Sequence, residues 1–238
     1  MPLSKKTLFA VILSLAGAAT FARLGFWQLS RLAERRAYNA HLLERLAAPP
    51  VLVTSLSADS ATGHYRRVSA HGVFDFSAQV ALAARSSRGS PGVHVLTPMR
   101  LSGDTIVMVN RGWVYSPDAR TVDLTKWRDH EGDTVTAVGY AETWTGRETA
   151  PLPPALRTVR TLDSAAVATL VGAPVLRYFV VQTSGHVAST ASPVGLGEPT
   201  LDEGSHRNYA IQWFSFMLIA LVGGTLLVRQ SYADSSGS

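Results

Sequence analysis

The chain has 238 residues, a formal net charge of +5 and no cysteine. This length leaves room for one soluble domain of ordinary size, and the lack of cysteine excludes disulfides, cysteine-bound zinc, iron–sulfur clusters and covalently attached c-type haem. Residues 1–36 hold the whole excess of positive charge, whereas residues 37–238 carry sixteen basic and sixteen acidic groups, which argues against a nucleic-acid partner.

The first apolar segment follows two lysines, and residues 7–22 carry no charge. A cleaved signal peptide would have this basic start, a short apolar stretch and small residues at its cleavage site, here 16–18. A retained anchor needs about 20 residues to cross the hydrocarbon core, which Leu8–Trp27 provides if Arg23 snorkels to the interface. We favour the retained anchor. The expected segments are a cytoplasmic N-terminus, 1–6, and a transmembrane helix, 7–27.

Nothing breaks the helical pattern between Trp27 and the two prolines at 49–50, so we expect a helical extension over residues 28–50. Leucines interspersed with charged residues are typical of an amphipathic helix that leaves the membrane. Three arginines lie near its start, Arg31, Arg35 and Arg36. They either meet anionic headgroups or propionates, or form an ordinary solvated face.

Residues 51–185 have short alternating or β-branched runs separated by turn residues, which indicates a β-rich domain. The expected strands are 65–74, 80–84, 93–100, 105–114, 134–141 and 175–183. One helix is expected at Ser164–Leu170, with Asp163 or Ser164 as its N-cap and Gly172 and Pro174 as its stop. Short loops between successive strands favour a mainly antiparallel sheet. Residues 186–208 are expected to be a linker leading to the membrane.

The second apolar segment, Tyr209–Val228, has twenty residues without a formal charge, enough for a second transmembrane helix. His206, Tyr209, Trp213 and then Phe216 or Met217 recur at the spacing of one helix face. Tyr and Trp are also typical of the aromatic belt at a membrane interface, and His206 is either an interfacial histidine or a ligand for a metal or haem iron. Gln212 lies one turn deeper, where its amide is expected to bond another helix or a bound group.

Two membrane helices with a domain between them place both termini on one side. Lys5, Lys6 and Arg229 indicate that this side is the cytoplasm, since short basic ends stay there. The tail 229–238 is then cytoplasmic. The expected fold is a membrane protein with two transmembrane helices flanking a β-rich α+β extracytoplasmic domain, in the cytoplasmic (inner) membrane of a bacterium with the domain in the periplasm.

Known enzyme motifs are missing. The sequence has no Gly-x-Ser-x-Gly, no His-Glu-x-x-His and no Walker loop, so we expect no enzymatic activity. The stretch Asn110-Arg-Gly-Trp113 closes an expected strand. It is either a structural corner, with glycine for a tight bend, or a docking or ligand site.

Four stretches, in order along the chain, resemble the surfeit locus protein 1 family, which includes Shy-type proteins of mitochondria. They are Leu24-Gly-Phe-Trp-Gln28 with Arg31; Tyr65-Arg-Arg-Val68 with Gly72-Val-Phe-Asp75, Arg85, Gly89, Gly92 and Thr97-Pro98; Val109-Asn-Arg-Gly-Trp-Val114; and His206-x-x-Tyr209-Ala-x-Gln212-Trp-Phe214. Tyr115 departs from the family, which often has proline there, and residues 151–200 match only loosely.

The resemblance implies a membrane chaperone that assists assembly of haem-copper cytochrome c oxidase, a complex of the respiratory chain, and works with its subunit I, other assembly factors and membrane lipids. For bacterial members it implies that haem a binds in the membrane, with His206 as the candidate axial ligand. The residues expected to bind this cofactor are His206, Tyr209, Gln212, Trp213, Arg23, Trp27, Gln28 and Arg31. In this picture Trp213 or Phe216 lines the macrocycle, and Arg23 or Arg31 pairs with propionates.

Two alternatives remain. One is a scaffold that stabilises the oxidase subunit during assembly through the helices and the corner at residues 110–115 without touching haem. The other is a membrane-anchored periplasmic hydrolase, which the missing nucleophile motifs disfavour.

Overall fold

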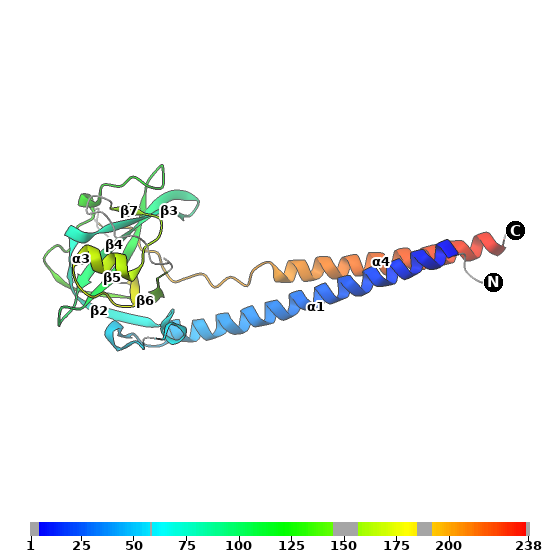
Figure 1. Ribbon diagram of the computed structural model, residues 1–238, viewed down its shortest axis with the longest axis horizontal. Helices are drawn as coiled ribbons and strands as arrows, with labels where there is room; N and C mark the ends of the chain where they lie inside the picture. Colours follow the sequence, from blue (N-terminus) through cyan, green and yellow to red (C-terminus); the bar gives the residue numbers. More distant parts are fainter. Residues whose placement is uncertain (1–4, 58, 145–156, 185–191, 237–238) are drawn as a thin grey trace. The chain divides into compact units, whose positions relative to one another are not determined.

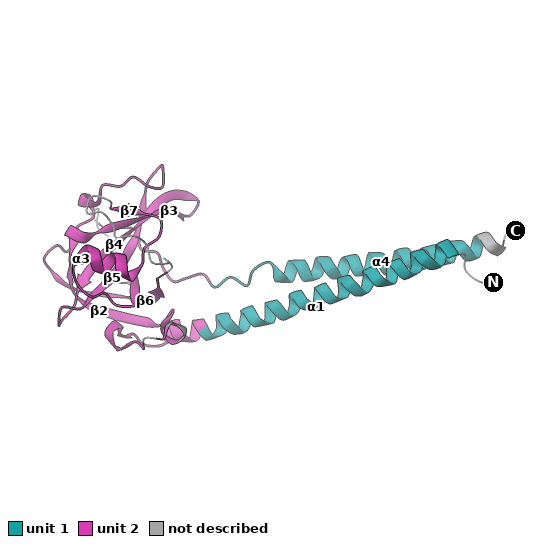
Figure 2. Ribbon diagram, viewed as in Figure 1, with its two compact units in different colours: residues 1–41, 201–238 teal, residues 42–200 magenta. Residues whose placement is uncertain are grey.

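The computed structural model describes residues 5–57, 59–144, 157–184 and 192–236. The chain divides into two compact units, coloured separately in Figure 2. One unit comprises Met1–His41 and Leu201–Ser238, and the other comprises Leu42–Thr200.

The first unit consists mainly of two long helices, α1 (Lys5–Ala47), whose last residues belong to the second unit, and α4 (His206–Ser236), shown in Figure 1. Both contain stretches long and apolar enough to cross a membrane. Only 11% of the most apolar window of α1 and 6% of that of α4 is buried within the protein. Helices of a soluble core would bury such stretches, so their exposure favours a lipid environment.

The second unit is built around an eight-stranded sheet in the order β1-β2-β6-β8-β5-β4-β3-β7. Its strands are β1 (Val51–Leu52), β2 (Arg67–Phe74), β3 (Val80–Ser87), β4 (Ser90–Arg100), β5 (Ile106–Tyr115), β6 (Thr134–Thr143), β7 (Thr158–Val159) and β8 (Tyr178–Ser184). The pairs β1–β2, β3–β7 and β5–β8 are parallel, and the other pairs are antiparallel. The expectation of a mainly antiparallel, sheet-rich unit between two apolar helices is therefore confirmed.

The sheet also closes on itself. The end of β2 pairs with the end of β4 through Val73↔Arg100 and Phe74↔Met99, so β2, β6, β8, β5 and β4 form a closed ring of strands. Buried side chains from these strands fill its inside, among them Val68, Met99, Val107, Val109 and Val180. Closure pairs strand edges that would otherwise be open to other chains.

Short helices complete this unit. They are α2 (Ser60–Gly63), α3 (Ser164–Val171) and the 3₁₀ turns η1 (Val53–Ser55), η2 (Phe76–Ala78) and η3 (Leu124–Lys126). Asp163 caps α3 by accepting a hydrogen bond from the Ala166 N–H at 2.8 Å, and Gly172 ends the helix in the left-handed conformation. The predicted position, cap and stop of this helix are confirmed. Part of the expected linker, residues 186–191, lies outside the described residues.

Candidate functional site

The helices α1 and α4 run antiparallel. Residues early in α1 contact residues late in α4, and residues later in α1 contact the beginning of α4. Thr7 donates a hydrogen bond to Ser231, and Gln28 contacts His206. The buried residues of α1 in this unit recur at intervals of three, four and seven: Ala18, Gly25, Gln28, Leu32 and Asn39. This is the spacing of a coiled-coil seam, so α4 packs along one stripe of α1.

Aromatic side chains fill the seam on the apolar side of His206. Phe21 of α1 stacks on Trp213 of α4 with ring centroids 5.9 Å apart and also contacts Phe216 at 5.7 Å. Trp213 and Phe216 meet edge to face at 5.9 Å. Aromatic contacts at these distances stabilise the pair by about 0.5–1.5 kcal/mol each beyond the area they bury.

Gly25, in the first of the four family-like stretches, accommodates Phe214. A Cβ added at Gly25 would lie 2.7 Å from the Phe214 ring, so a larger residue would require the ring or the helices to shift. Phe26 closes the other side of the same ring with an edge contact at 5.3 Å. The glycine therefore makes room for the Phe214 ring against α1.

His206 begins α4, and its Nδ1 lies 2.8 Å from Oε1 of Gln28. An amide oxygen only accepts hydrogen bonds, so Nδ1 carries the proton and Nε2 keeps its lone pair. Gln28 is buried, with 8% of its surface exposed, and Nε2 has no hydrogen-bond partner among the described residues. A ligating histidine is commonly oriented in this way by a second group that binds its other nitrogen.

An open pocket of about 480 Å³ lies beside the His206 ring. Its lining is strongly charged: Arg31, Glu34, Arg35, Tyr38, Asp202, Glu203, Gly204 and His206. Arg31 forms an exposed ion pair with Glu34 at 2.6 Å. The pocket therefore places a ligand-competent imidazole beside two guanidiniums, Arg31 and Arg35, and three carboxylates.

The segment before α4 is fastened to α1 by several polar contacts. Arg36 makes a two-pronged ion pair with Glu203, with N–O distances of 2.8 and 2.9 Å, and this lowers the pKa of the Glu203 carboxyl below its usual value. The amide of Asn39 donates to the carbonyl oxygens of Leu201 and Asp202, both at 3.2 Å. Together these contacts hold the chain just before His206 against α1.

The structure brings some of the predicted site residues together and separates others. Gln28, Arg31 and His206 share one end of the seam, and Trp213 lies farther along it in the aromatic cluster. The remaining predicted residues face outward: Tyr209, Gln212, Arg23 and Trp27 are exposed. Gln212 makes no hydrogen bond with any other residue that the structure describes. The expected stripe on one helix face is thus divided between the seam and the outer surface.

Sequence reasoning missed three contributors to this region: Phe21, Asn39 and Glu203. The first two follow the three-and-four spacing of the seam, which is readable in α1 once its buried face is identified. Glu203 lies in a stretch without periodicity, and its contact with Arg36 joins residues 167 positions apart. No local signal indicates such a pair.

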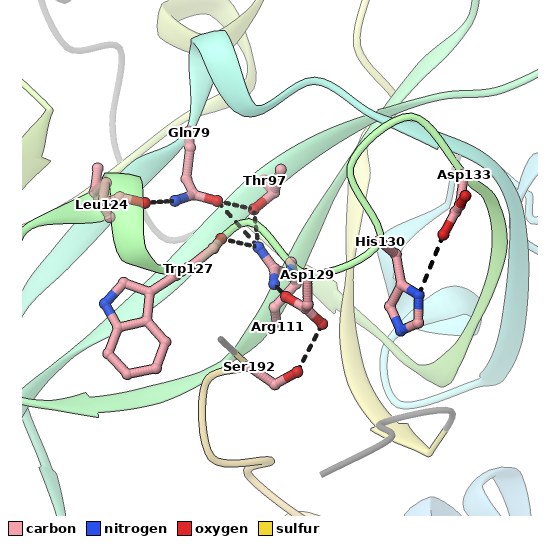
Figure 3. A network of polar contacts seen from close by, with 9 residues as sticks. All are labelled: Gln79, Thr97, Arg111, Leu124, Trp127, Asp129, His130, Asp133 and Ser192. Atoms are coloured by element: carbon pink, nitrogen blue, oxygen red, sulfur yellow. Dashed lines mark hydrogen bonds and ion pairs between the residues drawn. The ribbon is translucent and has the colours of Figure 1, made fainter. Parts of the chain in front are cut away.

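The Asn110–Trp113 stretch contains a buried cation, Arg111, whose polar contacts are drawn in Figure 3. Arg111, on β5, is 1% exposed and forms an ion pair with Asp129. Its guanidinium also donates to Gln79 Oε1 at 3.1 Å, Thr97 Oγ1 at 3.3 Å and the Trp127 carbonyl oxygen at 2.8 Å. Burial lowers the pKa of Arg111 to about 10, so it stays charged at neutral pH.

Gly112 supplies the bend next to this cation. Its φ of 137° is one that side chains disfavour, and an added Cβ would lie 2.3 Å from the Val194 carbonyl oxygen. Trp113 exchanges both backbone hydrogen bonds with Val194, at 2.7 and 2.8 Å. Of the two interpretations of this stretch, the geometry of Arg111 and Gly112 favours the structural corner.

Comparison with known proteins gives consistent matches over most of the chain. A sequence model of the SURF1 family matches residues 15–218. A SURF1-like protein of Rickettsia bellii is 25% identical over 221 residues, covering 90% of this chain and 87% of that protein. An uncharacterized SURF1-like protein of Mycobacterium tuberculosis is 28% identical over 213 residues, covering 85% and 76%. Surfeit locus protein 1 of Arabidopsis thaliana is 35% identical over 117 residues, covering 44% and 33%. The chain belongs to the SURF1 family.

Proposed function

We propose that this protein is a membrane-bound assembly factor for haem-copper cytochrome c oxidase, and that it holds haem a at His206 for insertion into the catalytic subunit. The observation that carries the haem proposal is the His206–Gln28 hydrogen bond of 2.8 Å. This bond leaves the Nε2 lone pair free, so His206 would be able to hold the haem iron.

The surroundings of His206 fit such a ligand. The adjacent pocket, about 480 Å³, is within the size range of small-molecule sites. Phe21, Trp213 and Phe216 supply aromatic surface along the seam, and Arg31 is positioned to exchange Glu34 for a propionate. The proposed iron ligand is His206 alone.

Each residue has a distinct role in this proposal. The Oε1 of Gln28 accepts a hydrogen bond from the Nδ1–H of His206 and keeps the imidazole ring from rotating. The aromatic cluster excludes lipid and water from the seam. A single histidine would hold the haem weakly, which would suit a carrier that must hand its cofactor on. When bound, haem would supply the redox iron that the oxidase needs.

We further propose the cytoplasmic membrane of a bacterium as the location, with both termini in the cytoplasm and the sheet domain in the periplasm. Lys5, Lys6 and Arg229 support this orientation, since basic ends are retained inside. The proposed partners are oxidase subunit I, other assembly factors and membrane lipids. Turnover of a substrate is not part of the proposal.

The outward-facing residues favour a second candidate function, a scaffold that binds the oxidase subunit without haem. Gln212 is exposed and makes no hydrogen bond within the described part of the chain. Inside a membrane a free amide is stabilised by bonding to another helix. Tyr209, 48% exposed, lies one turn before it and would extend the same contact surface.

The deciding experiment is the absorption spectrum of the full-length protein purified after co-expression with the enzymes of haem a synthesis. Wild type should show a haem a Soret band that His206→Ala loses or shifts. Gln28→Leu should weaken haem binding by about 10- to 100-fold, because the imidazole loses its orienting partner. Asn208→Ala, an exposed change in the same turn, should leave the spectrum unchanged.

If neither wild type nor His206→Ala binds haem a, the carrier role is wrong and the scaffold role stands. Restoration of oxidase activity by each variant in a deletion strain separates the two roles. A carrier requires His206, whereas a scaffold requires Gln212 and tolerates His206→Ala.

A further inference from the structure

A second pocket is lined only by residues of the sheet domain. Its volume is about 230 Å³, which corresponds to roughly eight water molecules at about 30 Å³ each. Its walls are largely apolar, formed by Leu82, Leu96, Trp144, Leu162, Phe179 and Val181. Six polar side chains also line it: Arg85, His94, Asn110, Tyr140, Glu142 and Thr161.

Bulges in three strand pairs adjoin these polar residues. The β3–β4 register shifts between Leu82 and Arg85, where Ala84 has a φ of 57°. The β4–β5 register shifts beside Asn110, and the β6–β8 register shifts one residue before Tyr140, at Gly139. Bulges commonly re-aim side chains next to functional sites. Three of them around one pocket distinguish it from an accidental packing gap.

Arg85 brings a positive charge to the pocket and forms no ion pair with any residue that the structure describes. Its guanidinium donates to the carbonyl oxygens of Ala83 at 3.1 Å and Arg160 at 3.4 Å. It has no acidic partner among the residues that the structure describes, and burial lowers its pKa. A partly buried cation without a counter-ion is costly, and an anion in the pocket would compensate it.

The neutral groups beside Arg85 are also hydrogen-bond donors. The Oδ1 of Asn110 accepts from the Gly112 N–H at 3.2 Å, so its Nδ2 faces His94 and donates to Nδ1 at 3.3 Å. His94 must therefore carry its proton on Nε2. Burial and the nearby Arg85 charge lower the pKa of His94 to about 4, which keeps it in this neutral form.

Tyr140 adds a hydroxyl donor. It is 8% exposed and makes no hydrogen bond with another described residue. Burial and the charge of Glu142 raise its pKa, so the phenol keeps its proton. Glu142 also lines the pocket, but its Oε1 already accepts from His64 Nε2 at 2.7 Å and from the Thr143 N–H at 2.9 Å. Arg85, His94 and Tyr140 thus supply donors to this lining, and Glu142 is its one described carboxylate.

We propose that this pocket binds a small monocarboxylate with an apolar body. The carboxylate is held by Arg85, with His94 and Tyr140 as further donors, and the apolar body packs against Trp144, Phe179 and the leucines. A carboxylate suits a guanidinium because two N–H groups match its two oxygens. The small volume excludes long acyl chains and restricts the ligand to about the size of benzoate.

The test uses 4-fluorobenzoate and the full-length protein in lipid nanodiscs, with binding followed by ¹⁹F line broadening and empty nanodiscs as the blank. Wild type should bind 4-fluorobenzoate, and unlabelled benzoate should displace it. Arg85→Met should raise the Kd about tenfold or more, because a charge-assisted pair is lost. Arg85→Lys should retain part of the affinity. Arg88→Met, which removes an exposed arginine in the neighbouring turn, should leave the Kd unchanged.

One neutral and one cationic analogue test whether the pocket recognises the carboxylate. Benzamide and benzylamine have the same ring without the carboxylate. If either binds as tightly as benzoate, or if Arg85→Met binds 4-fluorobenzoate like wild type, the pocket does not recognise a carboxylate and the proposal is wrong. Tyr140→Phe, which removes one oxygen, should weaken binding severalfold and serves if Arg85→Met fails to fold. This result is independent of haem binding at His206.

Discussion

Arg111 is a full positive charge inside the sheet domain, and its surroundings satisfy it from several directions. Asp129 neutralises it, three oxygens accept its N–H groups, and the rings of Phe74 and Phe76 lie 5.2 and 5.1 Å from its guanidinium carbon. A buried ion pair adds little stability over an apolar substitute, but removal of one partner leaves the other charge buried and uncompensated.

We therefore expect Arg111→Met to lower the free energy of unfolding of the sheet domain by about 3–5 kcal/mol. Arg128→Met is the matched control, because its ion pair with Glu131 is exposed and should contribute at most about 1 kcal/mol. Urea titrations followed by tryptophan fluorescence measure both. The double variant Arg111→Met/Asp129→Leu should recover part of the loss; an Arg111→Met protein as stable as the control would contradict this account.

His94 predicts a pH dependence of stability. Its pKa is about 4 in the folded protein and about 6.5 when unfolded. Between these values the unfolded chain binds a proton on His94 that the folded chain does not. The free energy of unfolding therefore has its full value above pH 6.5 and decreases as the pH falls toward 4. The loss attributable to His94 is at most about 3 kcal/mol. Urea midpoints between pH 7.5 and 4.5 should therefore fall less steeply for His94→Gln than for wild type; parallel curves would show that burial of His94 has no such effect.

At the scale of elements, the helix pair is held by shape as much as by apolar surface. Small residues allow close approach at two levels of the seam, Gly25 beside Phe214 and Gly224 beside Ser14. Such contacts are the usual means by which helices pack in lipid, where apolar surface alone provides no drive to associate.

The packing predicts a specific cross-link. A Cβ at Gly224 would lie 3.0 Å from the Ser14 Cβ, close to the 3.5–4.5 Å separation of disulfides. Because the native chain has no cysteine, Ser14→Cys/Gly224→Cys should form a disulfide on mild oxidation, detected as a mobility shift on non-reducing gels. Leu13→Cys/Gly224→Cys should not, since Leu13 is 63% exposed and faces away from the seam. Equal cross-linking of both pairs would contradict the packing.

Local sequence patterns predicted the elements that depend on local physics. Alternation placed the six longer strands, and Asp163 with Gly172 defined α3, because strand faces and helix caps are decided within a few residues. The closure of β2 onto β4 was not predictable in this way. The bulge at Ala84 was not predictable either, because a positive φ is expected at glycine and this position is alanine. At the candidate site, His206 stood out by its chemistry, but its pairing with Gln28, 178 positions away, required the fold.

At the scale of the whole molecule, the chain separates its two kinds of chemistry by sequence position. The terminal segments supply the apolar helices, the excess basic charge and His206. The middle segment supplies a sheet unit with balanced charge, the Arg111 network and the proposed carboxylate pocket. Composition alone revealed this division, since the charge excess ends at residue 36, whereas the internal organisation of the sheet unit depended on long-range pairing.

The contact of the Phe214 ring with Gly25 also determines the register in which α1 and α4 pack against each other. In a heptad seam, a slip of seven residues brings equivalent positions together and costs little in apolar contact. Here such a slip would set the ring against Leu32 in one direction or Ala18 in the other, and neither leaves the space that glycine does. The space at Gly25 thus selects one helix register out of several that are nearly equivalent. Because Gln28 lies one turn from Gly25, that same alignment brings the amide to the imidazole of His206.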